Sequence, residues 1–63
     1  MMKLYELPRN SLFTLDEGEL LNHKEQPVYR LERLDGMYSR CFEIVTGKLI
    51  HFSVGTPVKP FEA

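Results

Sequence analysis

The chain has 63 residues, of which 43% are hydrophobic and 27% are charged, and it carries a net charge of −1. These proportions exclude a disordered chain and indicate a globular domain. At this length residues 1–63 form one domain, which buries only about 60% of the surface that its unfolded state exposes.

The single cysteine excludes an intramolecular disulfide, and Cys41, His23 and His51 are too few to build a zinc site. An unpaired cysteine suits a reducing compartment. The start of the chain lacks the apolar core of a signal peptide, and no apolar run approaches the length of a membrane-spanning helix. We therefore expect a cytosolic protein without a metal ion, a cofactor or a membrane partner.

Two short apolar runs, 3–7 and 11–15, begin the chain and are separated by a bend at residues 8–10. Each run predicts a short strand. The segment 16–27 contains Gly18 and clustered charges without a regular period, so it predicts a loop or at most a single helical turn.

Three further runs, 27–34, 39–45 and 49–54, are rich in Val, Ile, Tyr and Phe and are separated by glycine turns. They predict an antiparallel meander with one apolar face. A second layer must cover that face, and the candidates are the N-terminal runs and the tail.

The tail contains Val58 between Pro57 and Pro60. Because proline lacks a backbone N–H, this pattern predicts a short strand at the edge of the sheet. Five short strands and no convincing helix predict an all-β fold: a small five-stranded antiparallel barrel, partly open, of SH3-like or related type.

The apolar pattern also predicts the register of the last hairpin. A three-residue loop at residues 46–48 pairs Phe42 with Phe52 and gathers the apolar side chains on one face. A two-residue loop would pair Phe42 with His51 instead, because a shift by one residue turns every side chain of a strand to the other face. With the three-residue loop, the residues that point inward together are Phe42, Ile44, Ile50, Phe52 and Val54.

The preceding hairpin contains Asp35 and Gly36, a strong turn signal. A loop with an even number of residues places Tyr29 and Leu31 inward. Two versions remain open, a two-residue loop at 35–36 and a four-residue loop at 35–38. We slightly prefer the longer loop, which pairs Leu31 with Phe42 and accepts Arg33 opposite Arg40.

Catalytic patterns are weak in this chain. The four glycines are each isolated in turns, so no phosphate-binding loop is present. Cys41 and His51 lie on one face in the predicted register, but only as diagonal neighbours, and small domains seldom offer the cleft that such a pair needs. We expect a protein that is not an enzyme.

The turn at Met37 and Tyr38 is the first candidate contact site. With a four-residue loop, two large apolar side chains lie at the tip of a hairpin. They either fold back to plug the open end of the barrel, which the small interior slightly favours, or form a protein-contact patch, since both residue types are enriched at interfaces.

Nucleic-acid binding is the second candidate activity. On the predicted hairpins, basic residues cluster with aromatic residues between them: Arg30, Arg33, Arg40 and Lys48, with Tyr29, Tyr38 and Phe42. Small barrels bind single strands by stacking bases on aromatic side chains within a basic groove. Glutamates are interleaved with these arginines, and the chain as a whole is slightly acidic, which favours a solvated strand face instead.

Two phrases carry a resemblance to small, uncharacterised proteins encoded by tailed bacteriophages: LPRNSLFTL at 7–15 and LDGMYSRCFEIVTGKLIHFSVGTPV at 34–58. The resemblance includes an Asp-Gly-Met-Tyr-Ser hairpin, a following cysteine and an apolar-His-apolar strand. It implies a viral accessory protein with a compact β fold, acting in the host cytoplasm, and it implies no catalytic residues.

Together these observations predict a phage accessory protein that acts as a non-enzymatic protein-interaction module, with a protein of the host as a candidate partner. Its candidate contact residues are Met37, Tyr38, Arg33 and Arg40. The alternative is a single-stranded nucleic-acid-binding small β-barrel. Self-association through open strand edges is a third expectation.

Overall fold

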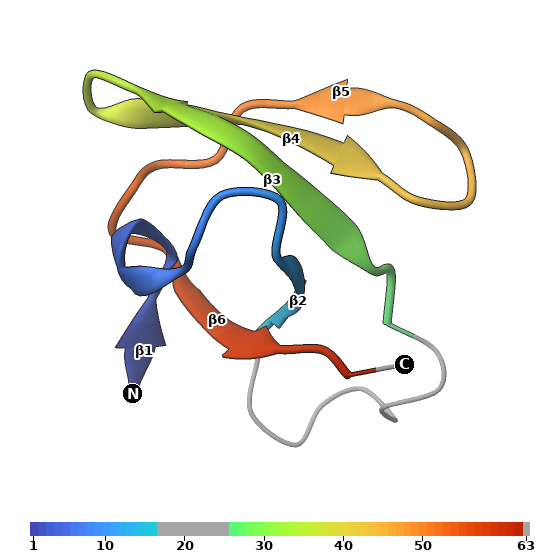
Figure 1. Ribbon diagram of the computed structural model, residues 1–63, viewed down its shortest axis with the longest axis horizontal. Helices are drawn as coiled ribbons and strands as arrows, with labels where there is room; N and C mark the ends of the chain where they lie inside the picture. The colour runs from blue at the N-terminus through green and yellow to red at the C-terminus, as the bar shows by residue number, and fades with distance from the viewer. Residues whose placement is uncertain (17–25, 63) are drawn as a thin grey trace.

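The computed structural model describes residues 1–16 and 26–62, which form short strands and one turn of 3-10 helix (Figure 1). These elements are β1 (Met2–Lys3), η1 (Leu4–Glu6), β2 (Leu12–Leu15), β3 (Tyr29–Asp35), β4 (Tyr38–Glu43), β5 (Leu49–Ile50) and β6 (Pro57–Pro60). The loop predicted over 16–27 lies, for residues 17–25, outside the described part of the chain.

The described strands form one antiparallel sheet in the order β1-β6-β2-β3-β4-β5. The segment that leaves β5 returns to the other end of the sheet. There Leu4 N–H donates to the Thr56 carbonyl (2.9 Å) and Tyr5 N–H donates to the Val54 carbonyl (3.0 Å). The all-β prediction is confirmed, with six strands in place of five, and the curved open sheet is compatible with a partly open barrel.

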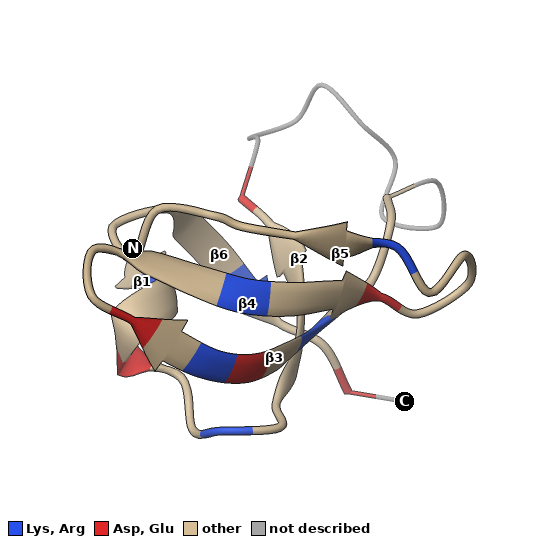
Figure 2. Cartoon of the chain, turned by 90° about the horizontal axis from the view of Figure 1, so that it is seen from above, with Lys and Arg blue, Asp and Glu red and all other residues tan. Residues whose placement is uncertain are grey.

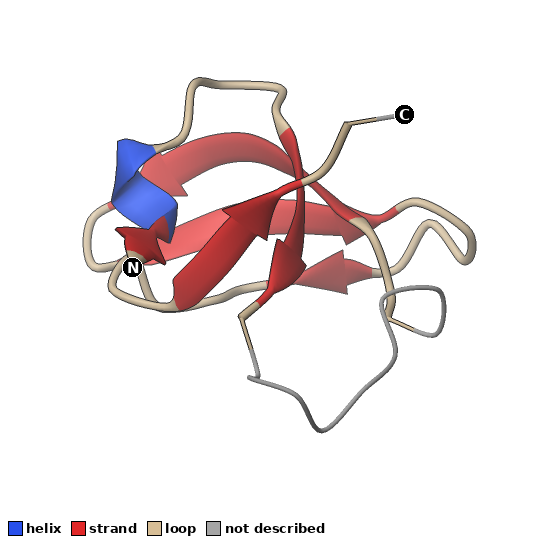
Figure 3. Cartoon of the chain, turned by 90° about the horizontal axis from the view of Figure 1, so that it is seen from below, coloured by secondary structure: helices blue, strands red, loops and turns tan. Residues whose placement is uncertain are grey.

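The first predicted strand, 3–7, is wrong beyond its first residue, because residues 4–6 form η1. Glu6 explains this locally: its carboxylate accepts a hydrogen bond from the Lys3 backbone N–H at 2.8 Å, which favours a helical turn over an extended chain. Leu4 in this turn and Leu7, which follows it, are buried. Figure 3 shows the turn in blue beside the red strands.

The predicted edge position of β6 is also wrong. The strand pairs with β1 on one side and with β2 on the other. Pro57 and Pro60 are its first and last residues, where a missing N–H is tolerated. The Pro57 carbonyl still accepts a hydrogen bond from Asp16 N–H (3.0 Å).

The β3–β4 hairpin closes with Asp35 opposite Tyr38, so its turn consists of Gly36 and Met37. Gly36 has a φ of 64°, which glycine adopts at little cost. Arg33 lies opposite Arg40, as the register of the longer predicted loop requires.

A β-bulge at Glu32 then changes the pairing along the rest of the hairpin. Beyond the bulge Leu31 lies opposite Cys41, whereas the prediction paired it with Phe42. Arg9 supports the bulge, since its Nε donates to the Glu32 carbonyl at 2.9 Å. The inward positions of Tyr29 and Leu31 are therefore confirmed, and the inward position of Phe42 is wrong.

The predicted loop between β4 and β5 is wrong as well. Cys41 lies opposite Ile50 and Phe42 opposite Leu49, a shift of three residues from the prediction. Five residues, 44–48, connect the two strands. A shift by an odd number of residues changes which residues of the two strands share a face. Phe42 therefore points away from the core, while Ile50 and Phe52 pack against it.

Ile44, predicted to point inward, is 49% exposed. The Glu43 carboxylate determines this loop, since it accepts Thr46 N–H at 2.7 Å. Hydrogen bonds from the side chain of Thr46 and from its backbone N–H lower the pKa of Glu43 below its ordinary value. Gly47, with a φ of 73°, completes the turn by donating its N–H to the Glu43 carbonyl (2.8 Å).

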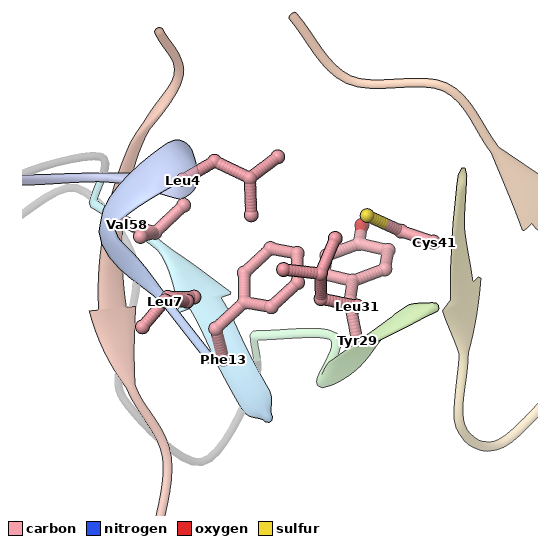
Figure 4. Close-up of a cluster of buried hydrophobic side chains, with 7 residues drawn as sticks. All are labelled: Leu4, Leu7, Phe13, Tyr29, Leu31, Cys41 and Val58. Carbon is pink, nitrogen blue, oxygen red and sulfur yellow. The ribbon is translucent and has the colours of Figure 1, made fainter. Parts of the chain in front are cut away.

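The core lies between η1, β2, β3, β4 and β6 (Figure 4). Its buried hydrophobic members are Leu4, Leu7, Phe13, Tyr29, Leu31, Cys41 and Val58. Phe13, Tyr29 and Phe52 contact one another, with ring centroids 4.9 to 6.1 Å apart. An interior this small depends on these few large side chains.

Candidate protein-contact site

The hairpin tip projects from one end of the sheet with its apolar side chains in solvent. Met37 is 78% exposed and Tyr38 is 59% exposed, so the predicted plug is wrong. Leu4 of η1 and Leu7, the residue after it, belong to the buried core instead. Two large apolar groups are left uncovered on a short turn.

The backbone of this tip is held in place by the segment that follows β5. Val54 N–H donates to the Met37 carbonyl (3.0 Å), and Tyr38 forms a bridge with Ser53. Ser39 is buried next to the tip and donates its hydroxyl to the Phe52 carbonyl at 2.9 Å. The tip therefore presents its side chains from a fixed backbone, which lowers the entropy lost when a partner binds.

Two further exposed apolar residues belong to the same end of the molecule (Figure 1). Tyr5, 57% exposed, is joined to the tip through Val54, whose carbonyl accepts Tyr5 N–H. Leu34, 43% exposed, lies two residues before the turn, opposite Ser39 and on the other face of the hairpin from Tyr38. We call Met37 and Tyr38 the tip patch.

Sequence reasoning did not find Tyr5, because it placed residues 3–7 in a strand. The signal that could have found it is the spacing of Lys3 and Glu6, which is typical of a helical turn in which Tyr5 would lie outside.

The two predicted arginines lie on the hairpin directly behind the tip. Arg33 and Arg40 are opposite each other, and Arg40 lies two residues after Tyr38 on the same face of β4. Arg40 forms an ion pair with Glu32 (Nε to Oε1, 3.1 Å), and both side chains are 30% exposed. Figure 2 shows the basic and acidic positions side by side on β3 and β4.

The structure thus brings Met37, Tyr38, Arg33 and Arg40 together on one hairpin, as the sequence predicts. Other residues that were predicted to bind nucleic acid are not available on this surface. Tyr29 is buried. Arg30 lies over the ring of Phe42, 5.4 Å from its centroid, where a cation–π contact holds it.

Cys41 and His51 lie on opposite faces of the sheet, so the predicted shared face is wrong. Cys41 is opposite Ile50 and buried in the core. Burial raises the pKa of its thiol, and the hydroxyl of Ser39, 3.2 Å from Sγ, offsets part of this rise. The ring of His51 instead contacts the Ser39 carbonyl through Nδ1 (3.0 Å).

Three further exposed apolar residues follow the opposite end of β4, in the loop to β5 and on β5 itself; Figure 1 shows this loop and strand. We call Ile44, Val45 and Leu49 the loop patch. Their exposed fractions are 49%, 89% and 37%. The sequence did not predict this surface, because the three-residue loop placed Ile44 in the core.

Over residues 1–16 and 26–62, no group of three or more His, Cys, Asp or Glu side chains is arranged to hold a metal ion. In the same residues no helix is long and apolar enough to cross a membrane. The chain matches no family, no curated protein and no solved structure in the comparisons made.

Proposed function

We propose that this chain is a non-enzymatic protein-interaction module that binds its partner through the tip patch. The observation that carries the proposal is the exposure of Met37 and Tyr38 on a backbone that Val54 holds in place. Tyrosine and methionine are enriched at protein interfaces, and a fixed aromatic side chain is typical of residues that dominate binding energy.

The chemistry around the patch indicates what such a partner offers. The tip patch fits a shallow apolar pocket, and Arg33 and Arg40 behind it favour acidic residues at the rim of that pocket. The resemblance to tailed-phage proteins supports a protein of the bacterial host as the partner.

A pull-down from host lysate tests this function. Wild type is compared with Met37→Ser/Tyr38→Ser and with the control Val45→Ser, which changes an even more exposed apolar residue just beyond the other end of β4. We expect the tip variant to lose a partner that wild type and control retain. With the recovered partner, the tip variant should bind at least about tenfold more weakly. A folded tip variant that retains every partner contradicts the proposal.

One observation favours single-stranded nucleic acid as a second candidate. Arg33 and Arg40 lie directly opposite each other, and Glu32 pairs with Arg40, whereas among the described residues Arg33 forms no ion pair and so can meet a phosphate. Fluorescence anisotropy of a labelled oligonucleotide at low and moderate salt tests it. Binding at low salt that weakens as salt rises supports this function, and no binding at low salt rejects it.

A further inference from the structure

The strand β5 lies at one edge of the sheet (Figure 1). Toward β4, Glu43 N–H donates to the Lys48 carbonyl (2.9 Å), and Ser39 N–H donates to the Phe52 carbonyl (2.8 Å). Since antiparallel pairs alternate, residues 48, 50 and 52 bond to β4, while the N–H and C=O of 49 and 51 point away from it.

Among the described residues, none bonds to the backbone N–H or C=O of His51. Protected sheet edges carry prolines, bulges or lysines. The two-residue strand β5 is short, which also protects an edge, and Lys48 precedes it, but residues 49–51 themselves carry no proline, bulge or lysine. This edge can therefore accept another strand.

The outward groups of this edge are arranged symmetrically. Leu49 and His51 are each one residue from Ile50. If a second copy of this segment lies antiparallel to the first, with a twofold axis beside Ile50, its outward backbone groups face those of the first copy. Leu49 of each copy then lies opposite His51 of the other, and four backbone hydrogen bonds form. No two side chains of like charge are opposed in this register.

We propose that the chain forms a twofold dimer in which the β5 edges of two copies pair in antiparallel fashion about Ile50. The two sheets then continue into one another. The exposed Leu49 of the loop patch loses contact with water at the same time. This surface is separate from the tip patch, which lies at the other end of β4.

Sedimentation velocity over a range from low micromolar to millimolar protein tests the dimer. We expect the apparent mass of wild type to rise toward twice that of the chain. In the variant Leu49→Lys/His51→Lys each pair opposes two lysines, so we expect a dissociation constant at least tenfold higher. In Leu49→Lys/His51→Glu each pair opposes a lysine and a glutamate, and dimerisation should return.

Circular dichroism verifies that each variant is folded, which both exposed positions allow. The tip variant Met37→Ser/Tyr38→Ser should dimerise as wild type does, so the dimer and the proposed partner contact succeed or fail separately. Wild type that stays monomeric overturns the dimer. So does a double-lysine variant that dimerises like wild type, a lysine–glutamate variant that stays monomeric, or a tip variant that loses the dimer.

Discussion

Cys41 illustrates how the environment of one side chain decides its chemistry. Its thiol is fully buried between β3 and β5, next to the hydroxyl of Ser39. Burial raises the pKa of the thiol, so the reactive thiolate is scarce at neutral pH. The residue therefore acts as a small apolar core residue.

We expect Cys41 to react with a thiol reagent at neutral pH only as fast as the domain unfolds. Labelling followed by mass spectrometry measures this rate, with and without denaturant. A short unstructured peptide that contains one cysteine is the control and should react at once. Labelling of the native protein as fast as the peptide would contradict the buried position.

At the scale of single elements, the hairpins depend on a few special positions. Gly36 has a φ of 64° in the β3–β4 turn, and nothing lies within 4 Å of the place where a Cβ would be added. A substitution there meets no steric clash with neighbouring residues. Its cost comes from the backbone conformation alone.

We expect Gly36→Ala to lower the free energy of unfolding by about 1–2 kcal/mol, because a Cβ disfavours positive φ. Gly55→Ala is the matched control, since Gly55 lacks a positive φ in the range that favours glycine and its nearest neighbouring atom lies 4.0 Å from the added Cβ. Urea denaturation measures both. If both substitutions lowered the free energy of unfolding by the same amount, the positive φ of Gly36 would not be the cause.

At the scale of the whole molecule, one small core carries the stability. A domain of this size has only about 3–5 kcal/mol to lose. Phe13 is fully buried and contacts both Tyr29 and Phe52. Phe42, by contrast, lies on the outer face below Arg30.

We expect Phe13→Ala to cost about 3–5 kcal/mol, which leaves the domain largely unfolded at room temperature. Phe42→Ala should cost about 0.5–1 kcal/mol, since it removes a partly exposed cation–π contact. Thermal denaturation followed by circular dichroism compares the two. If Phe42→Ala were as destabilising as Phe13→Ala, the β-bulge at Glu32 would not place Phe42 outside.

Local sequence signals were sufficient for the fold class and for several strands. The β-branched and aromatic runs, and the Asp-Gly turn, predicted the β3–β4 hairpin and the inward positions of Tyr29 and Leu31. They also placed Met37, Tyr38, Arg33 and Arg40 on that hairpin. These features depend on residues close together in the chain, where a period of two and a turn signal are informative.

Tertiary structure decided the registers and the order of the strands. The bulge at Glu32 is held by Arg9, 23 residues away, and the β4–β5 loop is held by the side chain of Glu43. Each of these contacts shifts the pairing by an odd number of residues and so exchanges the two faces of a strand, which moved Phe42 outward and Cys41 inward. The position of β6 between β1 and β2 depends on pairing across the whole chain. An apolar pattern with a period of two contains no information about such contacts.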